Sequence, residues 1–84
     1  MKQAVNNHKD YSFVSPQHIR AARGWLWWTL DDIEVNSGVT RGAVSKYETG
    51  KKNLSVKSRE VLYKTFLKEG VELLPDGIRA RETA

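Results

Sequence analysis

The sequence predicts a mainly α-helical fold, a compact four-helix domain that ends in a short C-terminal β-strand or hairpin. Two observations support this prediction. A Ser or Thr that can cap a helix precedes each of four segments with apolar residues at helical spacing. After Gly70 the apolar residues alternate instead, which is the period of a strand. Eighty-four residues are enough for one small domain.

The first 14 residues are polar and lack a helical period, so we expect a flexible N-terminal arm over residues 1–14. Lys2 and Lys9 would follow a phosphate backbone or reach a minor groove, and a disordered terminus is the alternative. Three apolar residues near its end either pack on the domain or add a short strand: Tyr11, Phe13 and Val14.

A first helix is predicted from Ser15, as the cap, and Pro16 to about Leu26. Ile19, Ala22 and Leu26 form its buried stripe.

Trp25 and Trp27 do not fit the buried stripe of this helix. Tryptophan is enriched at protein interfaces. We place packing over the small core first and a dimer or partner surface second, with an indole N–H donated to phosphate as a third alternative.

The central stretch Thr29 to Gly50 predicts two short helices around a tight turn. Thr29 can cap the first helix, with Asp32 reaching back. Gly38 suits the left-handed residue that follows a helix. Thr40 then caps a helix over Arg41–Glu48, so the whole stretch has the organisation of a helix-turn-helix.

The exposed side of the second helix predicts a double-stranded DNA ligand. Between Arg41 and Arg59 there are six Lys or Arg residues and one acidic residue. The candidate base contacts are Arg41, Gly42, Ser45 and Lys46, with Arg41 placed for a bidentate contact to guanine. The candidate phosphate contacts are Thr29, Thr40, Thr49, Lys51 and Lys52.

The last elements are a helix over Val56–Lys68, capped by Ser55, and a hairpin over residues 71–81 with a turn at Pro75-Asp76-Gly77. A lone hairpin is marginal in water, so it should pack on the helices or pair with a second subunit. The domain therefore divides into a helix-turn-helix unit, residues 15–70, and a short β element with the C-terminal tail, residues 71–84.

The string GVTRGAVSKYETGK, from Gly38 to Lys51, resembles the phage repressor and Cro-type (Xre-type) helix-turn-helix proteins. The resemblance extends from about Gln17 to Leu67. It implies a lambda-repressor-like fold and a role as a transcriptional regulator, a prokaryotic or phage repressor. It also implies a structural ion pair between Arg23 and Glu48.

The sequence departs from the pattern of this family at several positions, among them Leu30, Glu34 and Trp27. Leu30 stands where the family often has a phosphate-binding Gln, and Glu34 stands where it usually has a small residue packed on the next helix. Because Glu34 is larger than that residue, the two helices can approach as closely as in the family only if the Glu34 side chain turns to solvent. Trp27 replaces a Gly that is common in the family.

A single recognition helix reads few base pairs, so we expect a homodimer on a palindromic operator. The dimer or partner surface is predicted at Trp25, Trp27, Val71, Leu73 and Ile78. We favour the hairpin as the seam, and the alternative is a monomer whose hairpin folds back on the fourth helix. An antitoxin or adaptor module, acting on a toxin or another protein, is the second hypothesis for function.

Other classes of protein are disfavoured by composition. Without Cys there is neither a disulfide framework nor a thiolate metal site, and the two His residues cannot complete one, so we expect no metal and no cofactor. We find no catalytic residues, because a nucleophile with a base, a Gly-rich phosphate loop and paired carboxylates are all missing. The longest apolar run, Trp25–Trp28, is too short to span a membrane, and a cytoplasmic location is expected. The formal charge of +4 favours an anionic partner, although solvated lysines alone also explain it.

Overall fold

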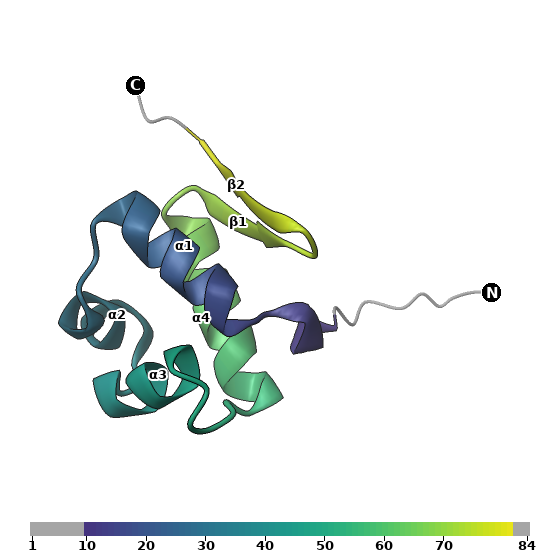
Figure 1. The fold of residues 1–84 in the computed structure, drawn as a ribbon. Coiled ribbons are helices and arrows are strands. Elements are labelled where there is room, and N and C mark those ends of the chain that lie inside the picture. The colour runs from purple at the N-terminus through teal and green to yellow at the C-terminus, as the bar shows by residue number, and fades with distance from the viewer. Residues whose placement is uncertain (1–9, 82–84) are drawn as a thin grey trace.

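The computed structural model describes residues 10–81, which form a compact, mainly helical domain with a short hairpin on one side (Figure 1). The elements are η1 (Tyr11–Phe13), a 3-10 turn, the helices α1 (Pro16–Leu26), α2 (Leu30–Ser37), α3 (Arg41–Glu48) and α4 (Val56–Lys68), and the strands β1 (Val71–Leu74) and β2 (Gly77–Ala80). The predicted helices and the predicted hairpin are therefore confirmed.

The helix starts follow from local capping. Each predicted cap accepts a hydrogen bond from the backbone N–H three residues on: Ser15 from His18, Thr29 from Asp32, Thr40 from Ala43 and Ser55 from Ser58. These hydrogen bonds satisfy N–H groups that have no partner inside the helix. The four start positions are therefore determined by neighbouring residues.

The core lies where α1, α4 and the hairpin meet α2 and α3. Its largest fully buried side chains are Phe66, Ile19, Ile33, Leu62, Leu73, Val14, Val44 and Val71. Trp28 closes one side, with its ring centroid 5.7 Å from that of Phe66. Burial of each such side chain stabilises the fold by about 1.5–3 kcal/mol.

The antiparallel hairpin packs on the helices, β1 on α4 and β2 on α1. Val71 and Leu73 are fully buried, and Ile78 is half-buried. The expectation that Val71 and Leu73 belong to a dimer or partner surface is therefore wrong, because the alternating face of β1 is part of the core. The hairpin packs on the fourth helix, α4, which is the placement that the alternative prediction gave for it.

The segment before α1 packs on the domain and forms no strand. Tyr11 and Val14 are buried, and the ring centroid of Tyr11 lies 5.1 Å from that of Tyr63 in an edge-on contact. The Tyr47 hydroxyl donates to the Val14 carbonyl oxygen at 2.6 Å. The packed domain therefore begins near Tyr11, before the expected boundary at residue 15, while Lys2 and Lys9 of the predicted arm and the end of the tail lie outside the described residues.

Candidate nucleic-acid interface

The corner between α2 and α3 is held by its own hydrogen bonds. Gly38 adopts φ +82°, the left-handed conformation that glycine tolerates best, and its N–H donates to the Glu34 carbonyl oxygen at 2.8 Å. The Ser37 hydroxyl donates to the Ile33 carbonyl oxygen at 2.6 Å and accepts from the Val39 N–H at 3.0 Å. The angle between the two helices is thus determined within a few residues.

Glu34 does not turn to solvent. Its Oε1 accepts a hydrogen bond from the Arg41 backbone N–H at 2.8 Å, so this carboxylate caps the N-terminus of α3 from the neighbouring helix. A negative charge is favourable at that end of a helix. Through this hydrogen bond the Glu34 side chain links α2 to α3.

The Arg41 side chain already has a partner. Its Nη1 lies 2.8 Å from Oδ1 of Asp31, and the two side chains are 58% and 69% exposed. Ion pairs this exposed stabilise a protein by roughly 0.2–1 kcal/mol, so an external ligand can displace Asp31. Sequence reasoning missed Asp31 as a partner, because the two residues lie ten positions apart and meet only once α2 and α3 have folded.

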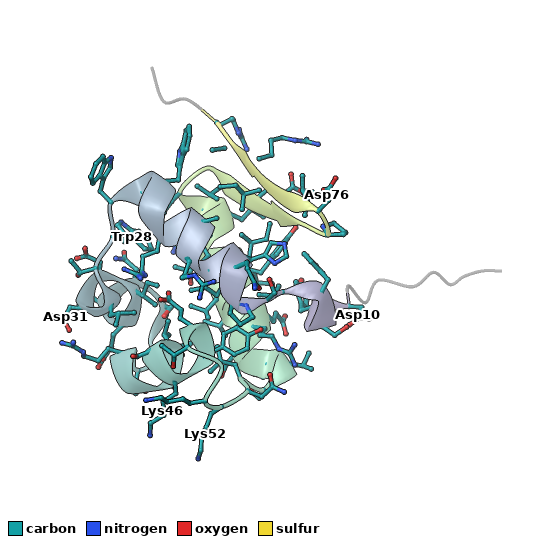
Figure 2. The ribbon with its side chains drawn as sticks, in the orientation of Figure 1. Asp10, Trp28, Asp31, Lys46, Lys52 and Asp76 are labelled. Carbon is teal, nitrogen blue, oxygen red and sulfur yellow. The ribbon has the colours of Figure 1, made fainter. Side chains whose placement is uncertain are left out.

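The other predicted base contacts lie along the exposed face of α3. Gly42 and Lys46 are exposed, and Ser45 is half-buried. A Cβ added at Gly42 would meet no atom within 4 Å, so the packing of the domain does not require glycine there. Lys46 points away from the domain (Figure 2).

The loop after α3 folds back over the end of that helix. The backbone N–H groups of Lys51 and Lys52 both donate to the Lys46 carbonyl oxygen, at 2.8 and 3.2 Å. The Thr49 hydroxyl donates to the Ser45 carbonyl oxygen at 3.0 Å. The backbone of Lys51 and Lys52 therefore lies beside the last turn of α3, and both residues are exposed. Figure 2 shows Lys46 and Lys52 projecting from the same end of the molecule.

The predicted ion pair between Arg23 and Glu48 is present and bidentate. Arg23 Nη2 lies 2.9 Å from Glu48 Oε1, and Arg23 Nε lies 3.0 Å from Oε2. Arg23 Nη1 also donates to the Trp28 carbonyl oxygen at 3.2 Å, and Arg20 donates to the Glu48 carbonyl oxygen. The hydrogen bonds to Glu48 raise the pKa of Arg23. This network joins α1 to the end of α3 and so orients α3.

The two capping threonines, Thr29 and Thr40, are exposed at the first residues of the corner helices. Each hydroxyl oxygen accepts from its own helix, at 3.1 Å from the Asp32 nitrogen and 3.3 Å from the Ala43 nitrogen. A hydroxyl also has one hydrogen to donate, which suits a phosphate oxygen. Thr29 caps α2 and Thr40 caps α3, so the two hydroxyls lie at the N-termini of different helices.

The expectation that Trp25 and Trp27 pack over the core is wrong. The side chains are 54% and 91% exposed. Trp27 follows the last residue of α1 with φ +58°, the left-handed conformation that strains residues with a Cβ. A glycine at this position would have no such strain.

Within residues 10–81, no group of three or more His, Cys, Asp or Glu side chains is placed to hold a metal ion. In the same range, every helix is too short or too polar to span a bilayer.

Comparison of the chain with protein-family models, with curated proteins and with solved structures found no match.

Proposed function

We propose that this chain is a sequence-specific double-stranded DNA-binding protein, a transcriptional regulator with a lambda-repressor-like helix-turn-helix. The main support is a rigid corner of two helices whose second helix and following loop expose Lys46, Lys51 and Lys52 at one end of the domain. A recognition helix of this kind enters the major groove with its N-terminal residues against the base edges.

In this proposal α3 reads bases through its first two turns. Arg41 leaves Asp31 and donates its guanidinium fork to guanine. Gly42 lets the backbone approach the DNA closely, which would explain a glycine that the domain itself does not require. Ser45 and Lys46 lie further along the same helix, within reach of bases or phosphates.

The loop and the capping hydroxyls set the register in the same proposal. Lys51 and Lys52 contact phosphates on one side of the groove, and Thr40 donates its hydroxyl hydrogen to a phosphate beside the corner. Thr29 donates its own to a phosphate at the start of α2. Glu34 occupies the first N–H of α3, so this helix end has less capacity to bind a phosphate itself.

The decisive experiment is the salt dependence of binding to generic duplex DNA. Replacing Lys51 and Lys52 by Ala should weaken binding to all sequences alike and reduce the salt slope by roughly 2, because two phosphate contacts are lost. The matched control replaces two exposed lysines of α4, Lys64 and Lys68, and changes the net charge equally. If both variants lose the same amount of DNA affinity, then binding depends only on the net charge of the protein. That result would contradict a defined DNA interface.

Arg41→Ala tests base recognition separately. It should weaken binding to the preferred site, found by selection from random DNA, by about 1–3 kcal/mol and relax the preference at one base pair. Asp31→Ala is the control, because it frees the guanidinium without removing it and should preserve the preference. A uniform loss on every sequence would assign Arg41 to a phosphate.

A protein-binding adaptor or antitoxin is the second candidate, and the exposed indoles of Trp25 and Trp27 favour it. Large aromatic side chains are frequent among the residues that dominate binding energy at protein interfaces. A pure adaptor predicts no binding to duplex DNA even at low salt, whereas a regulator predicts strong binding that falls steeply as salt is added.

A further inference from the structure

The first half of α2 carries three acidic residues, and two of them have a role in the fold. Asp32 completes the cap of α2, because its Oδ2 accepts from the Thr29 N–H at 2.8 Å. Glu34 accepts from the Arg41 N–H and links α2 to α3. Within residues 10–81 the Asp31 side chain accepts one hydrogen bond, from the Arg41 guanidinium. Asp31 is exposed, so its replacement removes no contact of the core.

The ion pair with Asp31 holds the Arg41 guanidinium against α2. Arg41 Nη1 lies 2.8 Å from Asp31 Oδ1, and Figure 2 shows Asp31 on a different side of the molecule from Lys46 and Lys52. A bidentate base contact requires the guanidinium in the groove that α3 enters, with free donors toward two acceptors of guanine. The paired conformation of Arg41 is therefore not the conformation that reads a base.

We propose that Asp31 is a specificity-determining residue, an internal competitor that weakens binding to the preferred DNA site more than binding to other sequences. The inference rests on the proposed function, because it concerns the same arginine and the same DNA surface. When only a fraction of a protein is competent to bind, its apparent affinity is reduced by that fraction. An exposed ion pair is weak, so paired and free Arg41 have comparable populations and the affinity for the preferred site falls about two- to sixfold.

Binding to other DNA sequences is weakened less. It depends mainly on phosphate contacts, for which Lys46, Lys51 and Lys52 are exposed whether or not Arg41 is paired. Arg41 then stays with Asp31, and the ion pair costs nothing. Where a phosphate draws Arg41 away, the new contact offsets the loss of the pair. The penalty from Asp31 is therefore largest at the preferred site.

Loss of the Asp31 charge also has a general effect on DNA binding. It raises the net charge of the protein by one, which strengthens the attraction to any duplex. This effect changes the affinities for the preferred site and for other sequences by a similar factor. The ratio of the two affinities therefore reports the competition for Arg41, whereas either affinity alone does not.

Asp31→Asn tests the proposal, because asparagine keeps the size of the side chain and removes its charge. Affinities are measured for the preferred site, found by selection from random DNA, and for a scrambled duplex of the same length. The ratio of the two affinities should rise about two- to sixfold. Asp76→Asn is the control, since it makes the same charge change in the hairpin turn, on another side of the molecule in Figure 2, and should leave the ratio unchanged.

The Arg41→Ala background identifies the residue through which Asp31 acts. No guanidinium is left to release there, so Asp31→Asn should no longer change the affinity ratio. A purely structural role of Asp31 at the start of α2 would change the unfolding midpoint and not the ratio. In the chain that retains Arg41, an unchanged ratio would overturn the proposal. A ratio that falls would also overturn it, because Asp31 would then brace Arg41 against the base.

These measurements separate the role of Asp31 from the function on which it rests. If neither the wild type nor Asp31→Asn binds any duplex at low salt, the DNA-binding function and the role of Asp31 are both overturned. If the wild type prefers its selected site and Asp31→Asn does not raise the affinity ratio, only the role of Asp31 is overturned.

Discussion

Trp27 holds a backbone conformation that its side chain does not favour. An L-residue in the left-handed region is strained by roughly 1–2 kcal/mol, and the side chain is 91% exposed, so burial compensates little of this strain. Contacts within the described chain therefore do not explain a tryptophan at this position.

Trp27→Gly should therefore stabilise the isolated domain by about 1 kcal/mol, because glycine adopts φ +58° without a Cβ clash. Thermal unfolding should show a higher midpoint, by several degrees for a domain of this size. Trp25→Ala, on the helix itself, is the control and should change stability little. A lower midpoint for Trp27→Gly would mean that the indole contributes packing after all.

Tyr47→Phe should lower stability at neutral pH by about 1 kcal/mol through loss of the hydrogen bond to Val14. Burial raises the pKa of Tyr47 above the ordinary value of 10.0. The folded chain thus holds the phenol proton more tightly than the unfolded chain, and this contribution is complete below pH 10.0 and is lost as the pH rises through the folded pKa.

Urea denaturation of both proteins at neutral pH and at about pH 11 measures this difference. The stability gap between wild type and Tyr47→Phe should narrow at the alkaline pH, because only the wild type has the Tyr47 contribution to lose. A stability gap that widens at the alkaline pH would contradict a raised pKa of Tyr47.

At the scale of the elements, α3 is oriented by contacts from two other helices. Arg23 of α1 holds its C-terminal end, and Glu34 of α2 caps its N-terminus. α3 has only eight residues and is too short to be stable alone. Its position therefore depends on side chains that belong to its neighbours.

Removing either partner of the Arg23–Glu48 pair should destabilise the domain and leave one charge without its partner in a partly buried site. We expect Glu48→Ala to cost about 2–4 kcal/mol, below the range for a fully buried pair because Arg23 is half-exposed. The double variant with Arg23→Ala should be more stable than the sum of the single losses predicts. If the losses of the two single variants, measured by denaturant unfolding, add up to the loss of the double variant, then Arg23 and Glu48 are not energetically coupled.

Glu34→Ala should destabilise the domain by about 1 kcal/mol, because the Arg41 N–H loses its acceptor. Glu34→Gln is the matched control, since its amide oxygen can still accept this hydrogen bond, and it should retain most of the stability. The two variants are compared by thermal unfolding. Equal losses would show that the charge at the helix end matters and the hydrogen bond does not.

At the scale of the whole molecule, the hairpin is part of the core and not an appendage. A chain that ends at Gly70 loses Val71 and Leu73, each fully buried and each worth about 1.5–3 kcal/mol. Against a total stability of about 5–15 kcal/mol, this loss should abolish cooperative unfolding. Circular dichroism during heating measures it, with a chain ending at Arg81 as the control. A retained sharp transition would mean that the helices form a core without the strands.

Local chemistry accounts for what was predictable in this fold. Caps, the glycine at the corner and the change of period after Gly70 act over a few residues, so they determine where each helix and strand begins. The pair between Arg23 and Glu48 was predictable only through resemblance to a family, because 25 positions separate the two residues.

The sequence by itself determined the four helices, the hairpin and the basic character of the surface after α3, because these depend on neighbouring residues and on composition. Only the tertiary structure decided that Glu34 caps α3, that Asp31 holds Arg41, and that Val71 and Leu73 are buried while Trp27 is exposed. Each of these depends on where one element packs against another. Apolar residues at helical or alternating spacing give the same sequence pattern whether their face packs in the core or contacts a partner. Only the packing of the elements distinguishes a core face from a partner face.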